Sequence, residues 1–477
     1  MTQTHFDCIV IGAGSGGLNV AGFMNRLGLS ILLIDKSDTS IGGDCLNFGC
    51  VPSKALIHVA KQLRTQREAT QFGPQVTGMV SWDVVKEYVR SRQEIIREHE
   101  NATWFRQKGM TVVLGEARFV DERTVAVDGV RYQAPKIIVA TGSRPRRLAV
   151  PGVERVQSLV TNETVFTMPQ LPRRLLVIGA GPIGVEMASA FADLGSQVVI
   201  VDTGARLLPR EDADVVAILS ARLAARGVRY LGEVTLESFL DSTTAQFRTI
   251  TGTTHTETFD TVLVAIGRVP NTESLNVTAA SIRLTDRGYI ETDAYLRTTN
   301  RRVFAVGDVT GREPFTHGAE LQAATVLRNF FTPFPRRYSA AHFGWTIFTD
   351  PQIATFGESP TELTARGVQY EVITQSCAED DRAITDGYQD GLLKLYISKK
   401  GVIFGGTMVA PQAGELVQEL MLAQSAGLTI GDLFNKVYPY PLATRINKRL
   451  AQQWSAKRLT PAVTTFLRII YTLSRGR

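Results

Sequence analysis

Cysteine and histidine are scarce in this 477-residue sequence, which has four cysteines and six histidines. Cys8 and Cys377 each stand alone, whereas Cys45 and Cys50 form a close pair. In a reducing compartment, a close pair is more often catalytic or metal-binding than a structural staple. A four-ligand zinc site is disfavoured, because the other two cysteines are unpaired in the sequence and no histidine-rich spacing accompanies them.

Long apolar runs are also missing. No window reaches the roughly 20 uninterrupted apolar residues that span a bilayer, and too few residues precede the first apolar strand to form a signal peptide. We therefore expect a cytoplasmic protein. The hydrophobic content of 44% fits a soluble globular enzyme, and 477 residues are enough for several hydrophobic cores.

Acidic residues are absent from residues 445–477, although the whole chain has 46 of them against 52 lysines and arginines. Without the eight basic residues of this stretch, the formal charge of +6 falls to −2. The excess of positive charge therefore lies in the C-terminal tail, and we expect no nucleic-acid partner. The eight residues are Arg445, Lys448, Arg449, Lys457, Arg458, Arg468, Arg475 and Arg477.

A unit of strand, glycine-rich turn, helix and second strand occurs twice. Both copies end in an aspartate that follows the first glycine by 23 positions, at Asp35 and at Asp202. Glycines in such a turn let a pyrophosphate approach a helix N-terminus, and the carboxylate accepts a hydrogen bond from a ribose hydroxyl. The sequence therefore predicts two dinucleotide sites, with their glycines at Gly12, Gly14 and Gly17 and at Gly179, Gly181 and Gly184.

Two further segments repeat, at 137–142 and 262–267. Each is an apolar strand that ends in glycine, with an arginine and a proline close behind. We interpret them as the closing strands of the two nucleotide domains. After residue 340 the pattern changes to strands at 392–397 and 402–406 and a long amphipathic helix near 415–427, which is typical of a separate α+β domain. The expected fold class is α/β, with two Rossmann-like dinucleotide-binding domains and a C-terminal α+β domain.

The segment from Gly42 to Lys54, Gly-Gly-Asp-Cys-Leu-Asn-Phe-Gly-Cys-Val-Pro-Ser-Lys, resembles the redox signature of the class I pyridine nucleotide-disulfide oxidoreductases. That family includes lipoamide dehydrogenase, glutathione reductase and mercuric reductase. The resemblance extends over residues 5–450, and the order of the motifs is the same, including Val-Phe-Ala-Val-Gly-Asp at 303–308.

The resemblance implies FAD at the first nucleotide site, NADH or NADPH at the second, and a homodimer. It divides the chain into a first FAD-binding part at 1–150, an NAD(P)-binding domain at 151–270, a second FAD-binding or central part at 271–340, an interface (dimerisation) domain at 341–455 and a basic extension at 456–477.

The resemblance also implies roles for single residues. Cys50 is the thiol next to the flavin, and Cys45 is the interchange thiol that meets the substrate. Lys54 and Glu186 match an ion pair beside the flavin, where a cation favours the reduced, anionic ring. The other residues implied to bind cofactors, beyond the glycines of the two turns, are Gly43, Thr141, Gly142, Gly267, Asp35, Asp202, Asp308 and His317.

Physical chemistry supports a reactive thiol at this place, because a cysteine in the first turn of a helix has its thiolate stabilised by unpaired N–H groups. Asp308 matches a residue that binds the FAD ribityl chain, and Asp35 one that binds its adenosine ribose. His317 matches a position near the flavin, with a satisfied structural histidine as the alternative. At the second site, Asp202 favours NADH, although Arg206 nearby offers a partner for the phosphate of NADPH.

The sequence departs from the family near its C-terminus. Disulfide-reducing members carry His-Pro followed shortly by Glu there, contributed across a dimer, whereas this chain has Tyr440 and Arg445 at those places and no histidine after His342. Positioned acid/base catalysis is worth roughly 10² to 10⁴ in rate, and tyrosine is a poor base near neutral pH. Efficient turnover of lipoamide or glutathione disulfide is therefore disfavoured.

Mercuric reductases also have a tyrosine near this place. Because two thiolates bind a soft ion well, a metal-ion reductase that holds its substrate transiently between Cys45 and Cys50 is the leading hypothesis. The chain lacks the C-terminal cysteine pair and the N-terminal Cys-x-x-Cys domain of those enzymes.

Two alternatives remain. One is a disulfide reductase resembling lipoamide dehydrogenase or glutathione reductase, and the other is a flavin redox sensor or membrane-surface electron carrier. The tail from Leu459 to Arg477 is either a packed or frayed extension, or a contact with an anionic membrane surface or a partner.

Overall fold

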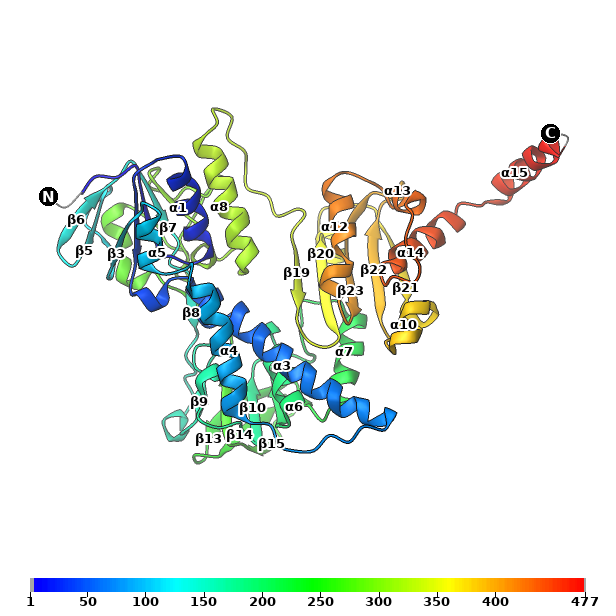
Figure 1. Cartoon of the computed structure of the whole chain (residues 1–477), viewed down its shortest axis with the longest axis horizontal. Helices are drawn as coiled ribbons and strands as arrows, with labels where there is room; N and C mark the ends of the chain where they lie inside the picture. The colour runs from blue at the N-terminus through cyan, green and yellow to red at the C-terminus, as the bar shows by residue number, and fades with distance from the viewer. Residues whose placement is uncertain (1–3, 476–477) are drawn as a thin grey trace. The chain divides into compact units, whose positions relative to one another are not determined.

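The computed structural model describes residues 4–475, and these form two compact units. One unit comprises the chain up to Leu207 together with Arg226–Ser339. The other comprises Leu208–Ala225 together with the chain from Ala340 onward. The first unit contains two parallel sheets, and the second contains an antiparallel sheet covered by helices (Figure 1).

A five-stranded parallel sheet forms the first half of the first unit. Its strands lie in the order β18 (Val303–Ala305), β7 (Lys136–Val139), β1 (Cys8–Ile11), β2 (Ile31–Asp35) and β3 (Thr111–Leu114). One face is covered by two helices that pack side by side, α1 (Ser15–Arg26) and α8 (Thr316–Phe330). The other face packs on an antiparallel ribbon of β4 (Arg118–Phe119), β5 (Thr124–Val127) and β6 (Val130–Gln133).

The second half repeats this layering. Its parallel strands lie in the order β12 (Arg229–Leu231), β11 (Gln197–Val201), β10 (Arg174–Ile178), β16 (Thr261–Val264) and β9 (Leu159–Val160). Helix α6 (Pro182–Leu194) packs on β10 and β11. The sheet shares a hydrophobic core with an antiparallel ribbon of β13 (Val234–Phe239), β14 (Thr244–Thr249) and β15 (Thr254–Thr258). The prediction of two Rossmann-like domains is confirmed.

The repeated segments at 137–142 and 262–267 form β7 and β16, each paired with the central strand of its sheet. They do not close the sheets, because β18 and β9 lie outside them. Beyond each strand the chain continues into β8 (Ser143–Pro145) and β17 (Arg268–Pro270), which pair with one another. The arginine and proline of the repeat therefore belong to a ribbon that joins the two halves.

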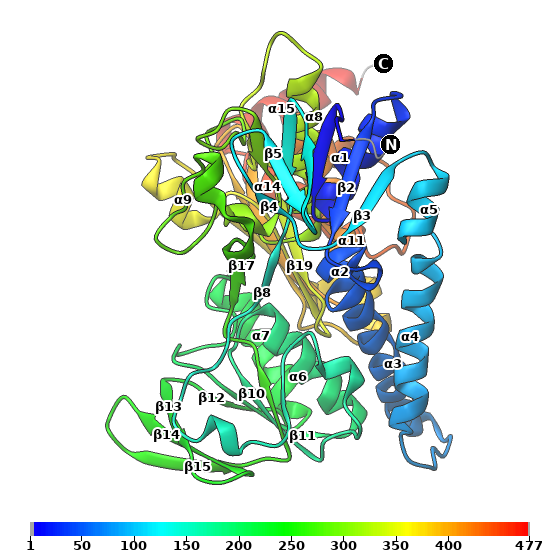
Figure 2. The ribbon, with the colours of Figure 1, turned by 90° about the vertical axis from the view of Figure 1, so that its left-hand side faces the viewer.

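The cysteine signature lies on two consecutive helices, α2 (Gly43–Asn47) and α3 (Cys50–Glu68). Helix α3 packs against α4 (Trp82–Arg97) and against α6 (Figure 2). Helix α5 (Ala102–Gln107) follows and leads into β3. Gly43, the first residue of α2, packs against Gly14, which brings the cysteine signature to the glycine-rich turn of the first sheet.

The second unit has an antiparallel sheet in the order β19 (Gly344–Ile347), β20 (Gln352–Gly357), β23 (Ile403–Ala410), β22 (Leu392–Ile397) and β21 (Glu371–Ser376). Its core is shared with five helices, α10 (Asp381–Asp386), α11 (Ala413–Leu416), α12 (Gln418–Ser425), α13 (Ile430–Asn435) and α14 (Arg445–Ala456). The long helix expected near 415–427 is observed as two consecutive helices, α11 and α12, with the buried Val417 between them.

The second unit also contains α7 (Ala213–Ala225), α9 (Pro360–Ala365) and α15 (Pro461–Ser474). Across residues 4–475, no helix combines the length and the apolar character needed to cross a bilayer.

Candidate active site

The two glycine-rich turns have matching local geometry. Gly12 and Gly179 have φ angles of +102° and +109°, and a Cβ at either would lie within 2.4 Å of a backbone carbonyl oxygen. A Cβ at Gly17 or Gly184 would lie 1.9 or 2.0 Å from the carbonyl oxygen of the first glycine of the same turn. The backbone itself therefore excludes side chains at all four positions, which keeps each turn tight against its helix.

The helices that follow these turns are open at their N-termini. Helices α1 and α6 begin after Gly14 and Gly181, with no side-chain cap and no acidic residue in the first turn. Gly43 approaches the first turn so closely that a Cβ on it would lie 2.7 Å from the Cα of Gly14. Uncapped N–H groups beside glycine backbone suit a pyrophosphate. The residues present therefore fit FAD at the first turn and a nicotinamide dinucleotide at the second.

The two aspartates that end the second strands also occupy equivalent places. Asp35 Oδ2 accepts a hydrogen bond from the Ala13 backbone N–H at 2.6 Å, and Asp202 Oδ2 accepts one from Ala180 at 2.7 Å. Each carboxylate thus holds its glycine turn in place. Their positions at the strand ends are those that ribose recognition requires.

The cysteine pair lies where α2 gives way to α3. Cys45 is partly buried on α2, and Cys50 is the exposed first residue of α3; neither forms a disulfide here. The Cys50 Sγ lies 3.3 Å from the Thr316 Oγ1, and Thr316 is the first residue of α8. The redox signature and the N-terminus of α8 therefore meet at one sulfur atom.

The two thiols differ in acidity. A hydrogen bond from the Cys45 thiol lowers the pKa of Cys50 to about 6, with further help from Thr316 and from the positive charge of Lys54. The same hydrogen bond, together with burial, raises the pKa of Cys45. Cys50 is therefore the thiolate of the pair, and Cys45 holds the proton.

Lys54 and Glu186 form an ion pair, with the Nζ of Lys54 2.9 Å from the Oε2 of Glu186. Lys54 lies one turn along α3 from Cys50, and Glu186 is a buried residue of α6. The pair therefore joins the cysteine-bearing helix to the helix of the second nucleotide turn. It also fixes a cation beside the Cys50 thiolate.

A cluster that the sequence did not reveal surrounds Arg268. Its guanidinium lies 3.0 Å from an oxygen of Asp44 and 3.8 Å from one of Asp308. Ser143 receives a hydrogen bond from Arg268 and donates one to Asp308. Burial raises the pKa of Asp44, and Arg268 opposes that rise. The only signal in the sequence was the arginine that follows the repeated strand.

The remaining predicted cofactor residues lie in the segments that follow the two repeated strands and at the start of α8. Thr141 and Gly142 connect β7 to β8, and Thr141 donates to the Asn271 carbonyl oxygen at 2.7 Å. Gly267 precedes Arg268, at the equivalent place of the second repeat. His317 is the second residue of α8, next to Thr316. All four of these residues belong to the first unit.

Tyr440 and Arg445 belong to the second unit. The Tyr440 side chain is 67% exposed, and the Arg445 guanidinium lies 5.2 Å from the centre of its ring. Arg445 also begins α14 and donates to the Tyr438 carbonyl oxygen. Tyr438, by contrast, is buried, and its hydroxyl donates to Glu419 at 2.9 Å. Tyr440 is therefore the tyrosine of this segment that a second molecule can reach.

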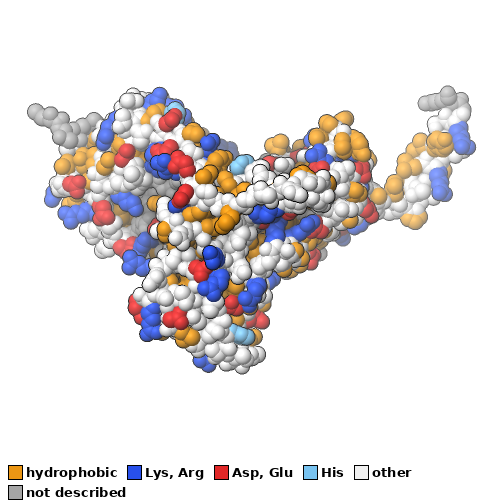
Figure 3. All heavy atoms as spheres, turned by 60° about the horizontal axis from the view of Figure 1, so that its bottom comes forward, with side chains coloured by type: hydrophobic (Ala, Val, Ile, Leu, Met, Phe, Trp, Pro, Cys, Tyr) orange, Lys and Arg blue, Asp and Glu red, His pale blue; other side chains and the backbone are white. Residues whose placement is uncertain are grey.

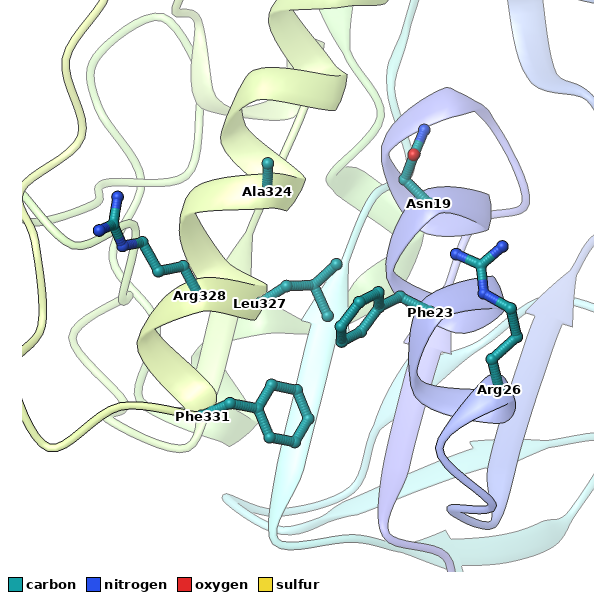
Figure 4. Close-up of a pocket in the computed structure, with 7 residues that line it drawn as sticks. All are labelled: Asn19, Phe23, Arg26, Ala324, Leu327, Arg328 and Phe331. Atoms are coloured by element: carbon teal, nitrogen blue, oxygen red, sulfur yellow. The ribbon is translucent and has the colours of Figure 1, made fainter.

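A shallow hollow of about 420 Å³ lies elsewhere in the first unit, between α1 and α8 (Figure 4). Phe23, Leu327 and Phe331 line it, together with Arg26 and Arg328. It contains none of the residues predicted for nucleotide binding or redox chemistry. Within residues 4–475, no group of three or more His, Cys, Asp or Glu side chains is arranged to hold a metal ion.

Two family profiles match the sequence. One, described as pyridine nucleotide-disulphide oxidoreductase, matches residues 6–323. The other, described as the dimerisation domain of that family, matches residues 344–450. The matches cover both parallel sheets and the antiparallel sheet, and they stop before the end of α14 and before α15.

Several similar proteins carry names that state an activity. A dihydrolipoyl dehydrogenase of Chlamydia trachomatis is 32% identical over 464 residues, which cover 95% of this chain and 96% of that protein. A mercuric reductase of Staphylococcus aureus is 29% identical over 441 residues, covering 91% of this chain and 80% of that protein. Among solved structures, the HOCl-induced flavoprotein disulfide reductase RclA of Escherichia coli matches with a TM-score of 0.83 at 25% identity, covering 94% of this chain and 99% of that one.

Proposed function

The chain belongs to the pyridine nucleotide-disulphide oxidoreductase family, and we propose that it uses NADH or NADPH to reduce a soft metal ion held by Cys45 and Cys50. Members of this family depend on FAD and take NAD(P)H as co-substrate. A dimerisation domain forms the second half of the match. The proposal concerns the electron acceptor, for which mercuric ion is the representative.

The observation that carries the proposal is the pairing of an intact dithiol with a tyrosine where a disulfide reductase needs histidine. The Arg445 guanidinium lies over the Tyr440 ring, and the chain has no histidine after His342. A disulfide substrate needs a positioned base to deprotonate the attacking thiol and an acid for the leaving thiol. A thiophilic metal ion needs neither, since thiolates bind it directly.

The residues divide the work as follows. The turns at Gly12 and Gly179 bind the two nucleotides, and Asp202 favours NADH by accepting from a free ribose hydroxyl. Lys54 stabilises negative charge near Cys50, and Cys45 with Cys50 holds the ion as two thiolates. When bound, FAD supplies the two-electron relay between the nicotinamide and this site.

The overall reaction balances without another reagent. One NAD(P)H and one Hg(II) give one NAD(P)⁺, one proton and one Hg(0). The Cys45 proton must leave when the ion binds, because both sulfurs then act as thiolates. In this proposal the exposed phenol of Tyr440, contributed by the partner subunit as the family resemblance implies, faces the ion from the opposite side.

A disulfide reductase is the second candidate, and the names of the relatives favour it. Proteins named dihydrolipoyl dehydrogenase match this chain over nearly its whole length. In that case Tyr440 would handle protons in place of histidine. Rapid turnover of lipoamide or glutathione disulfide would support this candidate over the first.

The test is an anaerobic panel on the FAD-loaded enzyme. NADH and NADPH are each offered with Hg(II) in excess thiol, with lipoamide and with glutathione disulfide, and cofactor consumption is followed. We expect Hg(II) to be the fastest oxidant and NADH the preferred donor. Cys50→Ala should abolish the reaction, whereas Cys377→Ala, which changes a buried cysteine of the second unit, should leave it intact. Hg(II)-dependent consumption that persists in Cys50→Ala would refute the proposal.

We also propose a cytoplasmic site of action, as the sequence predicts. Cell fractionation checks this: activity in the periplasmic or extracellular fraction would contradict it.

A further inference from the structure

Helix α15, Pro461–Ser474, lies beyond the end of the dimerisation-domain match at residue 450. The sequence specifies its start, since the Thr460 side chain accepts a hydrogen bond from the Val463 N–H and proline occupies the first turn. None of its residues is buried. The helix is therefore defined by local sequence and not by packing on the rest of its unit (Figure 1).

The side chains of α15 separate into two faces. At about 100° per residue, its threonines and arginines fall on one narrow stripe, formed by Thr464, Thr465, Arg468, Thr472 and Arg475. The apolar residues occupy the rest of the circumference and are between 40% and 76% exposed: Val463, Phe466, Leu467, Ile469, Ile470, Tyr471 and Leu473. Figure 3 shows hydrophobic side chains along this terminal helix.

An apolar face of this size favours a partner surface that buries it. Isolated helices of about 12 to 15 residues are marginal in water, and most helical stability in proteins comes from packing an apolar face. Seven large apolar side chains in water work against the helix, whereas burying them favours it. A helix of 14 residues extends only about 21 Å, too short for the roughly 30 Å core of a bilayer. The partner that buries the apolar face must therefore lie along the length of the helix, because the helix is too short to cross a bilayer.

The positive charges on and before α15 indicate which partner surface buries its apolar face. The last acidic residue of the sequence is Asp432, and every charged side chain after it is positive. Arg468 and Arg475 lie on the polar stripe of α15, and Lys457 with Arg458 precede the helix. Packing on a second copy of α15 through the apolar faces would leave these arginines on the outside without an anionic partner. A surface with an apolar interior and anionic headgroups satisfies both faces at once.

We propose that α15 anchors the enzyme on an anionic lipid bilayer, lying in the headgroup plane with its apolar face in the acyl boundary and its arginines among the phosphates. The anchor does not depend on which oxidant the active site reduces. It places the reductase at a membrane surface as a peripheral protein.

Flotation of the FAD-loaded, full-length protein with lipid vesicles tests the anchor. We expect it to float with vesicles of phosphatidylcholine and phosphatidylglycerol, much less with phosphatidylcholine alone, and less as salt is raised. Removal of residues 459–477 should abolish flotation while NAD(P)H oxidation in solution is retained.

Three pairs of substitutions distinguish the contributions of the apolar face, the polar stripe and the positive charges. Phe466→Gln with Ile470→Gln should weaken vesicle partitioning by about tenfold or more for each side chain. Thr465→Gln with Thr472→Gln, on the polar stripe, should leave it within about threefold. Arg468→Gln with Arg475→Gln should weaken it by about fivefold for each charge on anionic vesicles only.

Three results would overturn the anchor: no flotation of the full chain on anionic vesicles, equal flotation on neutral ones, or equal loss in the Phe466/Ile470 and Thr465/Thr472 pairs. Sedimentation of the full and shortened chains completes the test. If shortening lowers the oligomer mass and vesicle binding is absent, α15 is covered by another copy of the chain, and the anchor is wrong.

Discussion

Four features of its surroundings favour the thiolate form of Cys50. It begins α3, its sulfur lies 3.3 Å from the Thr316 hydroxyl, and the Lys54 ammonium follows one turn later. Cys45 supplies the strongest contribution, a hydrogen bond to the Cys50 sulfur. At the residue scale the site is therefore built as a thiolate with a thiol beside it, which suits both metal capture and reduction of a disulfide.

The first prediction concerns the pH dependence of alkylation. Because the pKa of Cys50 is lowered to about 6, its reaction with iodoacetamide in the reduced protein should persist as pH falls below the ordinary thiol range near 8.5. The rate should decline only as pH approaches 6. In Cys45→Ala the midpoint should move upward, because the hydrogen bond is lost.

Cys8 and Cys377 serve as internal controls, since burial raises the pKa of each to about 12. Mass spectrometry of the labelled peptides distinguishes the four sites. A Cys50 midpoint in the ordinary range, or one unchanged in Cys45→Ala, would contradict this account of the pair.

The second prediction concerns the replacement of histidine by tyrosine. Tyr440→His combined with Arg445→Glu restores the residues that disulfide-reducing members carry. Turnover of lipoamide with NADH should then rise, by up to roughly 10² to 10⁴ if proton transfer limits the reaction. Tyr440→Phe with Arg445→Glu is the matched control, because it changes the same positions without adding a base. Equal rates in the two variants would show that the missing histidine does not determine the substrate.

Single residues were predictable where a motif fixes them and unpredictable where only the fold does. The sequence indicated Lys54 and Glu186, which are 132 positions apart, through the family resemblance, and the structure joins them at 2.9 Å. Arg268 and Thr316 escaped notice. Their partners Asp44, Asp308 and Cys50 lie on other elements, and only the packing of those elements brings the groups together.

At the scale of single elements, the second glycine-rich turn contains two kinds of glycine. At one kind the protein's own backbone leaves no room for a side chain, and at the other only a bound ligand would. A Cβ at Gly184 would lie 2.0 Å from the Gly179 carbonyl oxygen, whereas a Cβ at Gly181 would meet nothing within 4 Å. Gly181 also has an extended backbone that any residue adopts. The protein therefore needs Gly184 in order to fold, and it needs Gly181 only if a ligand approaches the turn.

The third prediction uses that difference. Gly181→Ala should leave the melting temperature and FAD content unchanged but raise the KM for NADH, because the added methyl group lies where a pyrophosphate must approach. Gly184→Ala should lower the melting temperature and yield little folded protein. If Gly181→Ala leaves the KM for both nicotinamide cofactors unchanged, the second turn does not bind the pyrophosphate.

Elements with a strong local pattern were predicted close to their observed bounds. The strand expected at 392–397 is β22, and the strand expected at 402–406 extends to Ala410 as β23. The structure of the tail was harder to predict, because its apolar residues do not alternate with its arginines. Their spacing is helical instead, and α15 follows from it. The sequence alone did not show whether this helix packs on its own unit.

At the scale of the whole molecule, the internal repeat accounts for two parallel sheets with the same layering. One segment belongs instead to the second unit. Residues 208–225 follow the second nucleotide turn in sequence, yet they pack with the antiparallel sheet of the second unit. Glu211 accepts hydrogen bonds from Trp345 and Thr355, and Lys394 binds Asp212. A pattern of strands and turns could not reveal this, because the contacts connect residues more than 100 positions apart.

The fourth prediction concerns the dimer. If Tyr440 acts on the cysteine pair of the partner subunit, a heterodimer of Cys50→Ala and Tyr440→Phe chains contains one intact site. Co-expressed, differently tagged chains should then regain activity that neither homodimer has, up to about half of the wild-type rate. Purification through both tags isolates the heterodimer. Failure to regain activity would place each active site within one chain, and a fully active Tyr440→Phe homodimer would remove Tyr440 from the site.

The central claim is that electrons from NAD(P)H pass through the Cys45 and Cys50 pair to a soft metal ion. The most direct test is the stoichiometry of mercury reduction by the FAD-loaded enzyme, measured without oxygen and in excess thiol. We predict one Hg(0) released for each NADH consumed, with no release by Cys50→Ala. NADH consumption without Hg(0), or rapid consumption with lipoamide and none with Hg(II), would contradict the account and identify the enzyme as a disulfide reductase.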